Sequence, residues 1–511
     1  MLAKVYTSAL IGIDAYPVEV EVDLARGLPN FSIVGLPDTA VKEAKERVTA
    51  AIKNSELEFP SRRITVNLAP ADIRKEGSSF DLSIAIGILK ANGVIKNDEL
   101  SDYFILGELS LDGGVRRVNG VLPIALKARE EKIEKIILPL PNAQEAAVVK
   151  GIKVYPVRSL LETVKFLNKE ISIEPYRCNL EEALRQTSHY EVDFAEVKGQ
   201  EYVKRALEVA AAGSHNILMI GPPGAGKTML ARRIPTILPD LTLEEAIETT
   251  KLHSVAGLLK PHQAIVGTRP FRAPHHSISE AGLIGGGRIP RPGEVSLSHN
   301  GVLFLDELPE FPRHVLESLR QPLEDGVVSI SRALTSVSYP ARFMLVAAMN
   351  PCPCGYFGDP HHECTCTPLQ IQNYLSRVSG PLLDRIDIHI EVAAVRKEDL
   401  LDKRPAEPSS EIRKRVNRAR KIQEERFKGL PIHSNAQMSP KYIRRFCPLE
   451  KESEELLQNA ISELGLSARA YHRIIKISRT IADLEEKEKI EPAHISEALQ
   501  YRCLDRQLWR R

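Results

Sequence analysis

The chain shows no sign of a membrane-spanning segment, a secretory signal, a strong net charge or a disulfide framework. Its 511 residues contain no uninterrupted run of eighteen apolar residues, and the N-terminus lacks the basic-then-apolar form of a signal peptide. The net charge is only +2, so bulk electrostatics neither require nor exclude a nucleic-acid partner. Seven cysteines, an odd number with four of them clustered, do not resemble a disulfide framework. We therefore expect a cytoplasmic protein with no membrane segment.

What is present indicates a multidomain α/β protein. Hydrophobic residues make up 43% of the chain and charged residues 27%, enough for ordinary cores, and the length suggests about three domains. Short strands and helices alternate over residues 1–167, and residues 168–195 are mixed and polar, as in a linker. Residues 196–395 form the expected central domain. Residues 396–410, with Pro405 and Pro408, form a second boundary, and helical periodicity over residues 411–511 predicts a helical domain over 396–511.

Local patterns in the N-terminal part are specific enough to predict single elements. Residues 18–22 and 64–68 alternate with period two, which is typical of strands with one buried face. A helix is expected over residues 39–52, with Val41 and Val48 among the residues of its apolar face. Asp38 precedes this helix and can accept hydrogen bonds from its free N–H groups.

The most informative stretch fits the phosphate-binding pattern G-x-x-x-x-G-K-[ST]. It follows an apolar run over residues 216–220 and precedes a helical pattern that Pro235 closes. Glycines let the backbone N–H groups close around phosphates, the Lys227 ammonium neutralises phosphate charge, and the Thr228 hydroxyl can bind Mg²⁺. We expect ATP and Mg²⁺ to bind here. The loop comprises Gly221, Pro222, Pro223, Gly224, Ala225, Gly226, Lys227 and Thr228.

Further polar residues follow apolar strands downstream. Residues 301–305 lead into Asp306 and Glu307, which are expected to hold Mg²⁺ and to polarise the attacking water, respectively. Asn350 follows another apolar strand, where its amide either orients water or forms a turn before a proline. Arg385 lies in an apolar stretch and either reaches the γ-phosphate of a neighbouring subunit or forms an intrachain ion pair.

In this order the motifs resemble those of an AAA+ ATPase. The insertion over residues 269–287 and the segment 349–355 resemble the magnesium-chelatase-like branch, and the whole chain is similar to the ComM (YifB) family. This resemblance implies an α/β AAA+ core with a C-terminal helical lid, preceded by an α+β domain like that of Lon protease. It also implies roles for single residues: sensor 1 for Asn350, arginine finger for Arg385, sensor 2 for Arg469 with Arg473 as the alternative, and adenine-pocket lining for Val197 and Gly199.

The N-terminal domain resembles the proteolytic domain of Lon at residues 75–82 and 107–111, and Ser79 falls on the nucleophile position. The lysine that should activate this serine is missing, because Val121 follows Asn119 and Gly120 at the expected place. A serine hydroxyl without a base is a poor nucleophile near neutral pH. We expect a domain that keeps the fold without protease activity.

Four cysteines form two close pairs, Cys352 with Cys354 and Cys364 with Cys366, nine residues apart. Four thiols at this spacing either hold Zn²⁺ tetrahedrally or remain reduced in a loop, and the sequence leaves both readings open. The adjacent histidines at 275–276 are expected to be solvated or to contact phosphate rather than to bind metal.

The family resemblance implies an ATP-driven hexameric helicase that promotes branch migration in natural transformation and recombination, with single-stranded or branched DNA as partner. Physical support comes from residues 260–300, which carry five Lys or Arg against two acids, and from an expected hairpin over 326–342 bearing Arg332. A basic run over 411–428 is more typical of a solvated helix face. The alternatives are a chelatase-like motor that remodels a protein client and an ATP-dependent protease. The Lon-like domain argues against the first, and the missing lysine argues against the second.

Overall fold

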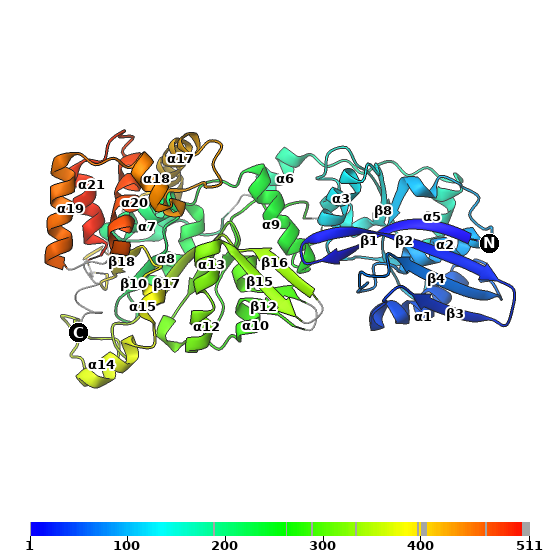
Figure 1. Ribbon diagram of the computed structural model, residues 1–511, viewed down its shortest axis with the longest axis horizontal. Helices are drawn as coiled ribbons and strands as arrows, with labels where there is room; N and C mark the ends of the chain where they lie inside the picture. Colours follow the sequence, from blue (N-terminus) through cyan, green and yellow to red (C-terminus); the bar gives the residue numbers. More distant parts are fainter. Residues whose placement is uncertain are drawn as a thin grey trace. The chain divides into compact units, whose positions relative to one another are not determined.

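The computed structural model describes residues 2–187, 190–261, 263–287, 290–332, 335–395, 398–399, 406–464 and 468–502 (Figure 1). The chain divides into two compact units. Unit 1 comprises residues 1–188 and 243–267, and unit 2 comprises residues 189–242 and 268–511.

Unit 1 is built on a seven-stranded sheet in the order β3-β4-β2-β1-β5-β8-β9. The strands β1, β2 and β4 pair antiparallel, and the other neighbours pair parallel. These strands are β1 (Leu2–Ile11), β2 (Asp14–Ala25), β3 (Asn30–Val34), β4 (Arg63–Ala69), β5 (Tyr103–Ile105), β8 (Lys135–Pro139) and β9 (Lys153–Val157).

Helices cover both faces of this sheet. Successive residues of a strand point to opposite faces, and Ile105 and Phe104 accordingly belong to different cores. The Ile105 core includes α1 (Thr39–Asn54), α2 (Asp81–Ala91) and α5 (Leu160–Leu167). The Phe104 core includes α3 (Val121–Glu130) and α4 (Ala143–Ala146). Burial on both faces is most complete at β5 and β8, whereas β2 and β4 alternate buried apolar residues with more exposed polar ones.

The local predictions for this unit are confirmed. The Val41 N–H donates to Asp38 Oδ1 over 2.8 Å, so Asp38 caps α1 as expected. Val41 and Val48 are fully buried on the inner face of α1. The alternating segments 18–22 and 64–68 lie within β2 and β4.

Residues 243–267 pack in unit 1, although the sequence placed them inside the central domain. They include α9 (Leu243–Val255), which packs against α3. The Ser254 hydroxyl donates to the buried carboxylate of Glu145, and the Gly120 N–H donates to the Ser254 carbonyl over 3.2 Å. Burial raises the pKa of Glu145, while its bonds from Ser254 and the Leu122 N–H oppose that rise.

Unit 2 contains a five-stranded parallel sheet in the order β11-β14-β17-β10-β18. Its strands are β10 (Ile217–Ile220), β11 (Phe271–Arg272), β14 (Val302–Leu305), β17 (Met344–Met349) and β18 (Ile388–Glu391). Every residue of β10, β14 and β17 is buried, as expected for central strands of a parallel sheet. The loops that follow these three strands leave from the same edge of the sheet, where α/β proteins bind ligands.

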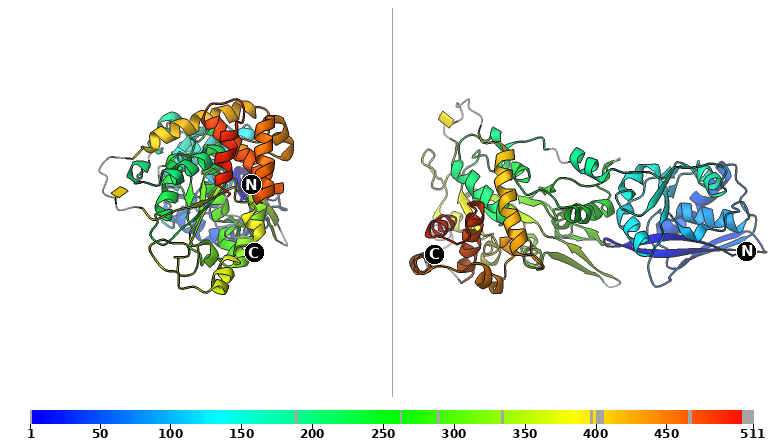
Figure 2. Two further views of the ribbon diagram at one scale, coloured as in Figure 1. Left: turned by 90° about the vertical axis from the view of Figure 1, so that its left-hand side faces the viewer. Right: turned by 90° about the horizontal axis from the view of Figure 1, so that it is seen from above.

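The C-terminal helices gather into one bundle (Figure 2), which confirms the helical prediction over the described part of residues 411–511. They are α17 (Ser409–Arg426), α18 (Pro440–Phe446), α19 (Lys451–Leu464), α20 (Ala468–Leu484) and α21 (Pro492–Gln500). The helix α20 packs on α17, α21 and α7 (Glu201–Gly213). The buried Asp483 accepts from Arg426 Nη1 over 2.7 Å and from Asn435 Nδ2 over 2.8 Å, which joins the helices through a satisfied polar network. Much of the predicted boundary over 396–410 lies outside the described residues.

The expected hairpin is present as β15 (Val327–Arg332) paired antiparallel with β16 (Thr335–Pro340). Its side chains alternate: Val328 and Tyr339 are buried, whereas Ser329 and Ser338 are exposed. The Tyr339 hydroxyl donates to the Pro290 carbonyl over 2.8 Å, so the hairpin packs against the segment that follows the insertion. The side chains of Arg332 and Arg288, both counted in the sequence analysis, lie outside the described part of the structure.

Candidate functional site

The phosphate-binding pattern forms a loop between β10 and α8 (Lys227–Arg233). Gly224 and Gly226 have φ of +77° and +86°, a left-handed conformation that favours glycine. A Cβ on Gly221 would lie 2.1 Å from the Val392 carbonyl oxygen, so this position has no space for a side chain. Glycine at all three positions therefore has a physical reason, either conformation or close approach.

Lys227 points into this loop and is only 8% exposed. Its Nζ donates to the carbonyls of Gly221 over 2.7 Å and Pro222 over 2.9 Å, and to Asn350 Oδ1 over 3.1 Å. Burial lowers the pKa of Lys227, and the charges of nearby carboxylates oppose that shift. The contact with Asn350 brings the end of β17 to the phosphate loop.

Asp306 and Glu307 follow β14 at the same edge. Thr228 Oγ1 donates to Asp306 Oδ2 over 2.6 Å, so a hydroxyl and a carboxylate converge as a ligand set that suits Mg²⁺. Glu307 adopts a left-handed φ of 52° and is 58% exposed at its side chain. The Glu307 carboxylate therefore lies open to solvent beside the phosphate loop.

Two polar contacts at this site were not predicted from the sequence. His276 Nδ1 lies 3.3 Å from Glu307 Oε2, although the sequence suggested solvation or phosphate contact for this histidine. Gln200 Nε2 donates to the Ala225 carbonyl over 2.9 Å and to the Ala393 carbonyl over 2.8 Å, which links the phosphate loop to the end of β18. Each contact joins segments that are distant in the chain, so no local pattern indicates it.

The segment expected to line an adenine pocket lies beside Gln200. Val197 is fully buried, and Gly199 has a left-handed φ of +62°. A Cβ on Gly199 would lie 2.9 Å from Asp399 Oδ2, so the backbone approaches this carboxylate closely.

Arg385 makes intrachain contacts. Its Nη2 pairs with Glu324, its Nη1 donates to the Pro381 carbonyl over 2.6 Å, and its side chain is 12% exposed. Within the single chain, Arg385 therefore forms the intrachain ion pair that was one of its two expected roles. Arg469 also lies in this region, with Nη1 3.2 Å from Asp384 Oδ2.

The lid helix α20 holds the same segment through a second arginine. Arg473 Nε lies 3.3 Å from Asp387 Oδ1, and His215 Nδ1 lies 3.2 Å from Asp387 Oδ2. Burial opposes ionisation of Asp387, but the bond to His215 and the nearby positive charges lower its pKa below the ordinary value. The segment that carries Arg385 is thus attached to α20 by the ion pairs Arg469–Asp384 and Arg473–Asp387.

Known relatives cover nearly all of the chain. Competence protein ComM of Haemophilus influenzae is 47% identical over 511 residues, which is 99% of this chain and 98% of that protein. The uncharacterized protein YifB of Escherichia coli is 44% identical over 509 residues, again 99% and 98% of the two chains. The chain belongs to the ComM/YifB family. Family models agree: magnesium chelatase, subunit ChlI, matches residues 193–400; subunit ChlI of Mg-chelatase matches 20–142; and the C-terminal model of that subunit matches 406–502.

More distant similarity extends to the chelatases themselves. The magnesium-chelatase 38 kDa subunit of Rhodobacter capsulatus is 26% identical over 231 residues, which is 42% of this chain and 62% of that protein. Membership of the ComM/YifB family, with its magnesium-chelatase-like AAA+ core, implies ATPase activity and the use of ATP and Mg²⁺, and AAA+ proteins are typically oligomeric. The fold expected from the resemblance is confirmed. No helix in the described residues is both long and apolar enough to cross a membrane.

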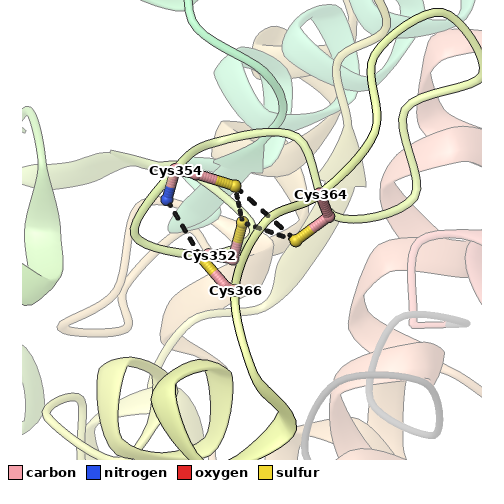
Figure 3. Close-up of side chains that lie close together, drawn as sticks. All are labelled: Cys352, Cys354, Cys364 and Cys366. Atoms are coloured by element: carbon pink, nitrogen blue, oxygen red, sulfur yellow. Dashed lines mark hydrogen bonds between the residues drawn. The ribbon is translucent and has the colours of Figure 1, made fainter.

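The four clustered cysteines of this ComM/YifB family member lie together in the loop after β17, and their side chains point toward one another (Figure 3). The sulfur of Cys352 lies 3.3 Å from that of Cys354 and 3.7 Å from that of Cys364, and all four sulfurs lie within 4.8 Å of one another. A disulfide would need about 2.05 Å between sulfurs. Four sulfurs around a tetrahedral Zn²⁺ at about 2.3 Å are separated by about 3.8 Å. The cluster therefore has the dimensions of a metal site. Its members are Cys352, Cys354, Cys364 and Cys366.

In the Lon-like part of unit 1, two lysines of the same unit as Ser79 have other partners. Lys75 is fully buried and donates to the Pro70 carbonyl, and Lys127 pairs with Glu130 and Glu131. The adjacent buried Asp81 instead accepts two bonds from Arg47, at 2.7 and 2.9 Å, which fixes this segment to α1. These hydrogen bonds and ion pairs stabilise the fold of unit 1.

Proposed function

We propose that this chain is an ATP-driven DNA motor that works as a hexameric ring and promotes branch migration during recombination. One observation carries the proposal: the chain is 47% identical, over nearly its whole length, to a protein named for competence. The convergence of Lys227, Thr228, Asp306 and Asn350 at one sheet edge supports the ATPase part of the proposal.

Each site residue has a role in the proposed hydrolysis. The backbone N–H groups of residues 224–228 and the Lys227 ammonium bind phosphate oxygens, and Thr228 and Asp306 are the residues that would hold Mg²⁺. Bound Mg²⁺ supplies charge neutralisation on the phosphates. Glu307, exposed beside the loop, accepts the proton of the attacking water, and Asn350 orients that water.

The remaining roles concern the lid and the neighbouring subunit. Arg385 stabilises transition-state charge at a neighbour's phosphate, after leaving its intrachain partner Glu324. Arg469 senses nucleotide from the lid, and Val197 and Gly199 line the adenine pocket.

The surface proposed to contact DNA is the β15–β16 hairpin together with the insertion beside it. Serine hydroxyls face solvent in cross-strand pairs, Ser329 with Ser338 at 3.2 Å and Ser331 with Ser336 at 3.1 Å. Arg291 is exposed on β13 (Arg291–Pro292), which pairs with β12 (Gly285–Gly286) of the insertion. Hydroxyl and guanidinium donors suit phosphate oxygens, whose recognition is independent of base sequence.

Other basic residues counted in the sequence have structural partners. Arg269 donates to the carbonyl of Asn300 over 2.7 Å, and Arg272 pairs with Glu294. On α17, Arg415 pairs with Glu407 and with the buried Glu208. These cations stabilise unit 2 internally, so the DNA proposal rests on the hairpin and Arg291 rather than on α17.

We also propose that the four cysteines bind one structural Zn²⁺. Two observations support this: three of the sulfurs lie 3.3–3.7 Å apart with all four within 4.8 Å, and thiolates are preferred zinc ligands. Elemental analysis of chain purified with zinc available is expected to find one zinc per chain.

The decisive experiment measures ATPase activity with and without single-stranded and branched DNA over a salt series. DNA is expected to stimulate hydrolysis, with a stimulation that falls steeply as salt rises, because phosphate contacts release counterions. Arg291→Ala is expected to weaken this stimulation, whereas Arg418→Ala on α17, an exposed arginine paired with Glu486, serves as the control and should keep it. ATPase activity that ignores every form of DNA at low salt, in a protein that remodels a protein client, would refute the DNA proposal and support a chelatase-like motor.

A further inference from the structure

The loop that carries the cysteines also touches the phosphate loop. Gly355, which follows the first cysteine pair, has a left-handed φ of +89° and lies close to Pro223. A Cβ on Gly355 would lie 2.5 Å from Pro223 Cδ and 2.7 Å from Pro223 Cγ. The turn is closed by the Gly355 N–H, which donates to the Cys352 carbonyl over 3.0 Å. The buried Cys352 and the phosphate loop are therefore separated by one tight turn.

The far end of the same loop returns to the nucleotide site. Cys366 precedes Thr367, which caps α14 (Pro368–Leu375) in a capping box with Gln370. The Tyr374 ring of α14 is buried, and burial raises its pKa to about 12 while a hydrogen bond from the Asn350 backbone opposes that rise. The loop thus begins directly after Asn350 and ends on a helix that contacts Asn350 again.

A third contact reaches the turn that follows the acidic pair. Arg377, just beyond α14, donates to Glu310 Oε2 over 2.9 Å and to the Pro309 carbonyl over 3.4 Å. These acceptors lie in η5 (Leu308–Glu310), directly after Asp306 and Glu307. The cysteine loop (residues 351–366), together with α14 and Arg377 after it, therefore connects the three segments that supply Lys227, Asn350 and Glu307.

We infer that metal bound by the four cysteines controls nucleotide binding, because it holds the cysteine loop in the shape that supports the phosphate loop through Gly355 and Pro223. This inference rests on the proposed zinc site. Two ligands that favour the same conformation raise each other's affinity by the same factor. Zinc must then strengthen nucleotide binding, and nucleotide must strengthen zinc binding equally, with no requirement for hydrolysis.

The first test measures both directions of this coupling on the full chain. The affinity for a fluorescent ATP analogue is compared in zinc-loaded, chelator-depleted and zinc-restored protein, and zinc affinity is measured by competition with a chromophoric chelator with and without the analogue. Removing zinc is expected to weaken nucleotide binding by about 5- to 150-fold, and the analogue should raise zinc affinity by the same factor. Restoring zinc should restore nucleotide affinity, which separates a reversible effect from unfolding.

The second test uses a matched pair of glycines from the same loop. Gly355→Ala keeps all four cysteines but places a Cβ against Pro223, whereas Gly358→Ala adds the same Cβ at a similar φ of +82° with nothing within 4 Å. Both variants should retain one zinc per chain. Only Gly355→Ala should weaken nucleotide binding, by at least about tenfold if the supporting contact is lost.

The outcomes separate the two proposals. A folded chain without zinc after purification with zinc available would refute the zinc site, and the coupling with it. One zinc per chain with equal nucleotide affinity in loaded and depleted protein would refute the coupling and leave the zinc site intact. Equal nucleotide affinity in Gly355→Ala and Gly358→Ala would exclude the contact with Pro223 as the route.

Discussion

Replacing Arg385 by alanine distinguishes a structural arginine from one that acts on a neighbour's nucleotide. Within one chain its charged partner is Glu324, which is 57% exposed. A pair with such an exposed member contributes about 0–1 kcal/mol, since water screens the charges. If this pair were the only role of Arg385, its loss would change turnover by no more than about fivefold.

A finger acting across a subunit interface predicts a much larger effect. Such arginines contribute about 10³- to 10⁵-fold to turnover in phosphoryl transfer. Arg385→Ala should therefore keep nucleotide affinity and lose at least about a thousandfold in steady-state ATPase rate at saturating ATP. Glu324→Gln is the control, because it removes the same ion pair and keeps the guanidinium. It should hydrolyse ATP at close to the wild-type rate.

Mixing experiments then establish which subunit supplies the arginine. Lys227→Ala subunits keep Arg385 but bind nucleotide poorly, and Arg385→Ala subunits bind nucleotide but lack the finger. In a random equal mixture, roughly a quarter of the interfaces in a cyclic ring combine an intact site with an intact finger. Activity in the mixture should exceed that of both parents. A turnover loss in Arg385→Ala no larger than in Glu324→Gln would refute the finger role.

Three further predictions follow from the described contacts. Lys227→Ala should lose nucleotide affinity, whereas Glu307→Gln should bind ATP and retain it unhydrolysed, because the glutamine amide keeps the shape of the side chain but cannot act as a base. Filter binding with labelled ATP measures both effects. ATP hydrolysis at the wild-type rate by either variant would contradict the role assigned to that residue. Ser79→Ala should leave ATPase activity unchanged, and peptide hydrolysis should be at background in both proteins; a peptidase activity that the variant loses would overturn this. Asp387→Asn should destabilise unit 2 by about 3 kcal/mol, because His215 loses its buried partner. Since the pKa of Asp387 is depressed in the fold, its contribution is present above about pH 4 and is lost as pH falls further; urea midpoints whose difference stays constant down to pH 3 would argue against it.

Elements defined by neighbouring residues could be predicted from the sequence. The helix α1 and its Asp38 cap follow from a side chain and an N–H three positions apart. The phosphate loop, from Gly221 to Thr228, lies between a buried strand and a helix, as its pattern requires. Turn geometry and capping depend on a few adjacent residues, so these predictions needed no knowledge of tertiary contacts.

Contacts between distant segments were not predictable in the same way. The docking of α9 in unit 1 involves its packing against α3 and the bond between Ser254 and Glu145, and no property of residues 243–267 alone indicates it. The partners of α17 are a similar case. From the sequence, its basic run could either contact DNA or face solvent, whereas in the structure Arg415 pairs with Glu208, which lies on another helix.

The sequence alone determined which chemistry the chain carries: a phosphate loop with Lys227, two acids at a strand end, and four cysteines close enough to share a metal. These depend on residue type and short spacing, which the chain encodes directly. Only the tertiary structure decided which of these groups act together. It brought Asn350 into hydrogen-bond contact with Lys227, His276 within 3.3 Å of Glu307, and Gly355 close to Pro223. Such contacts are set by how strands order in the sheet and how loops close over it, and those depend on packing across the whole unit.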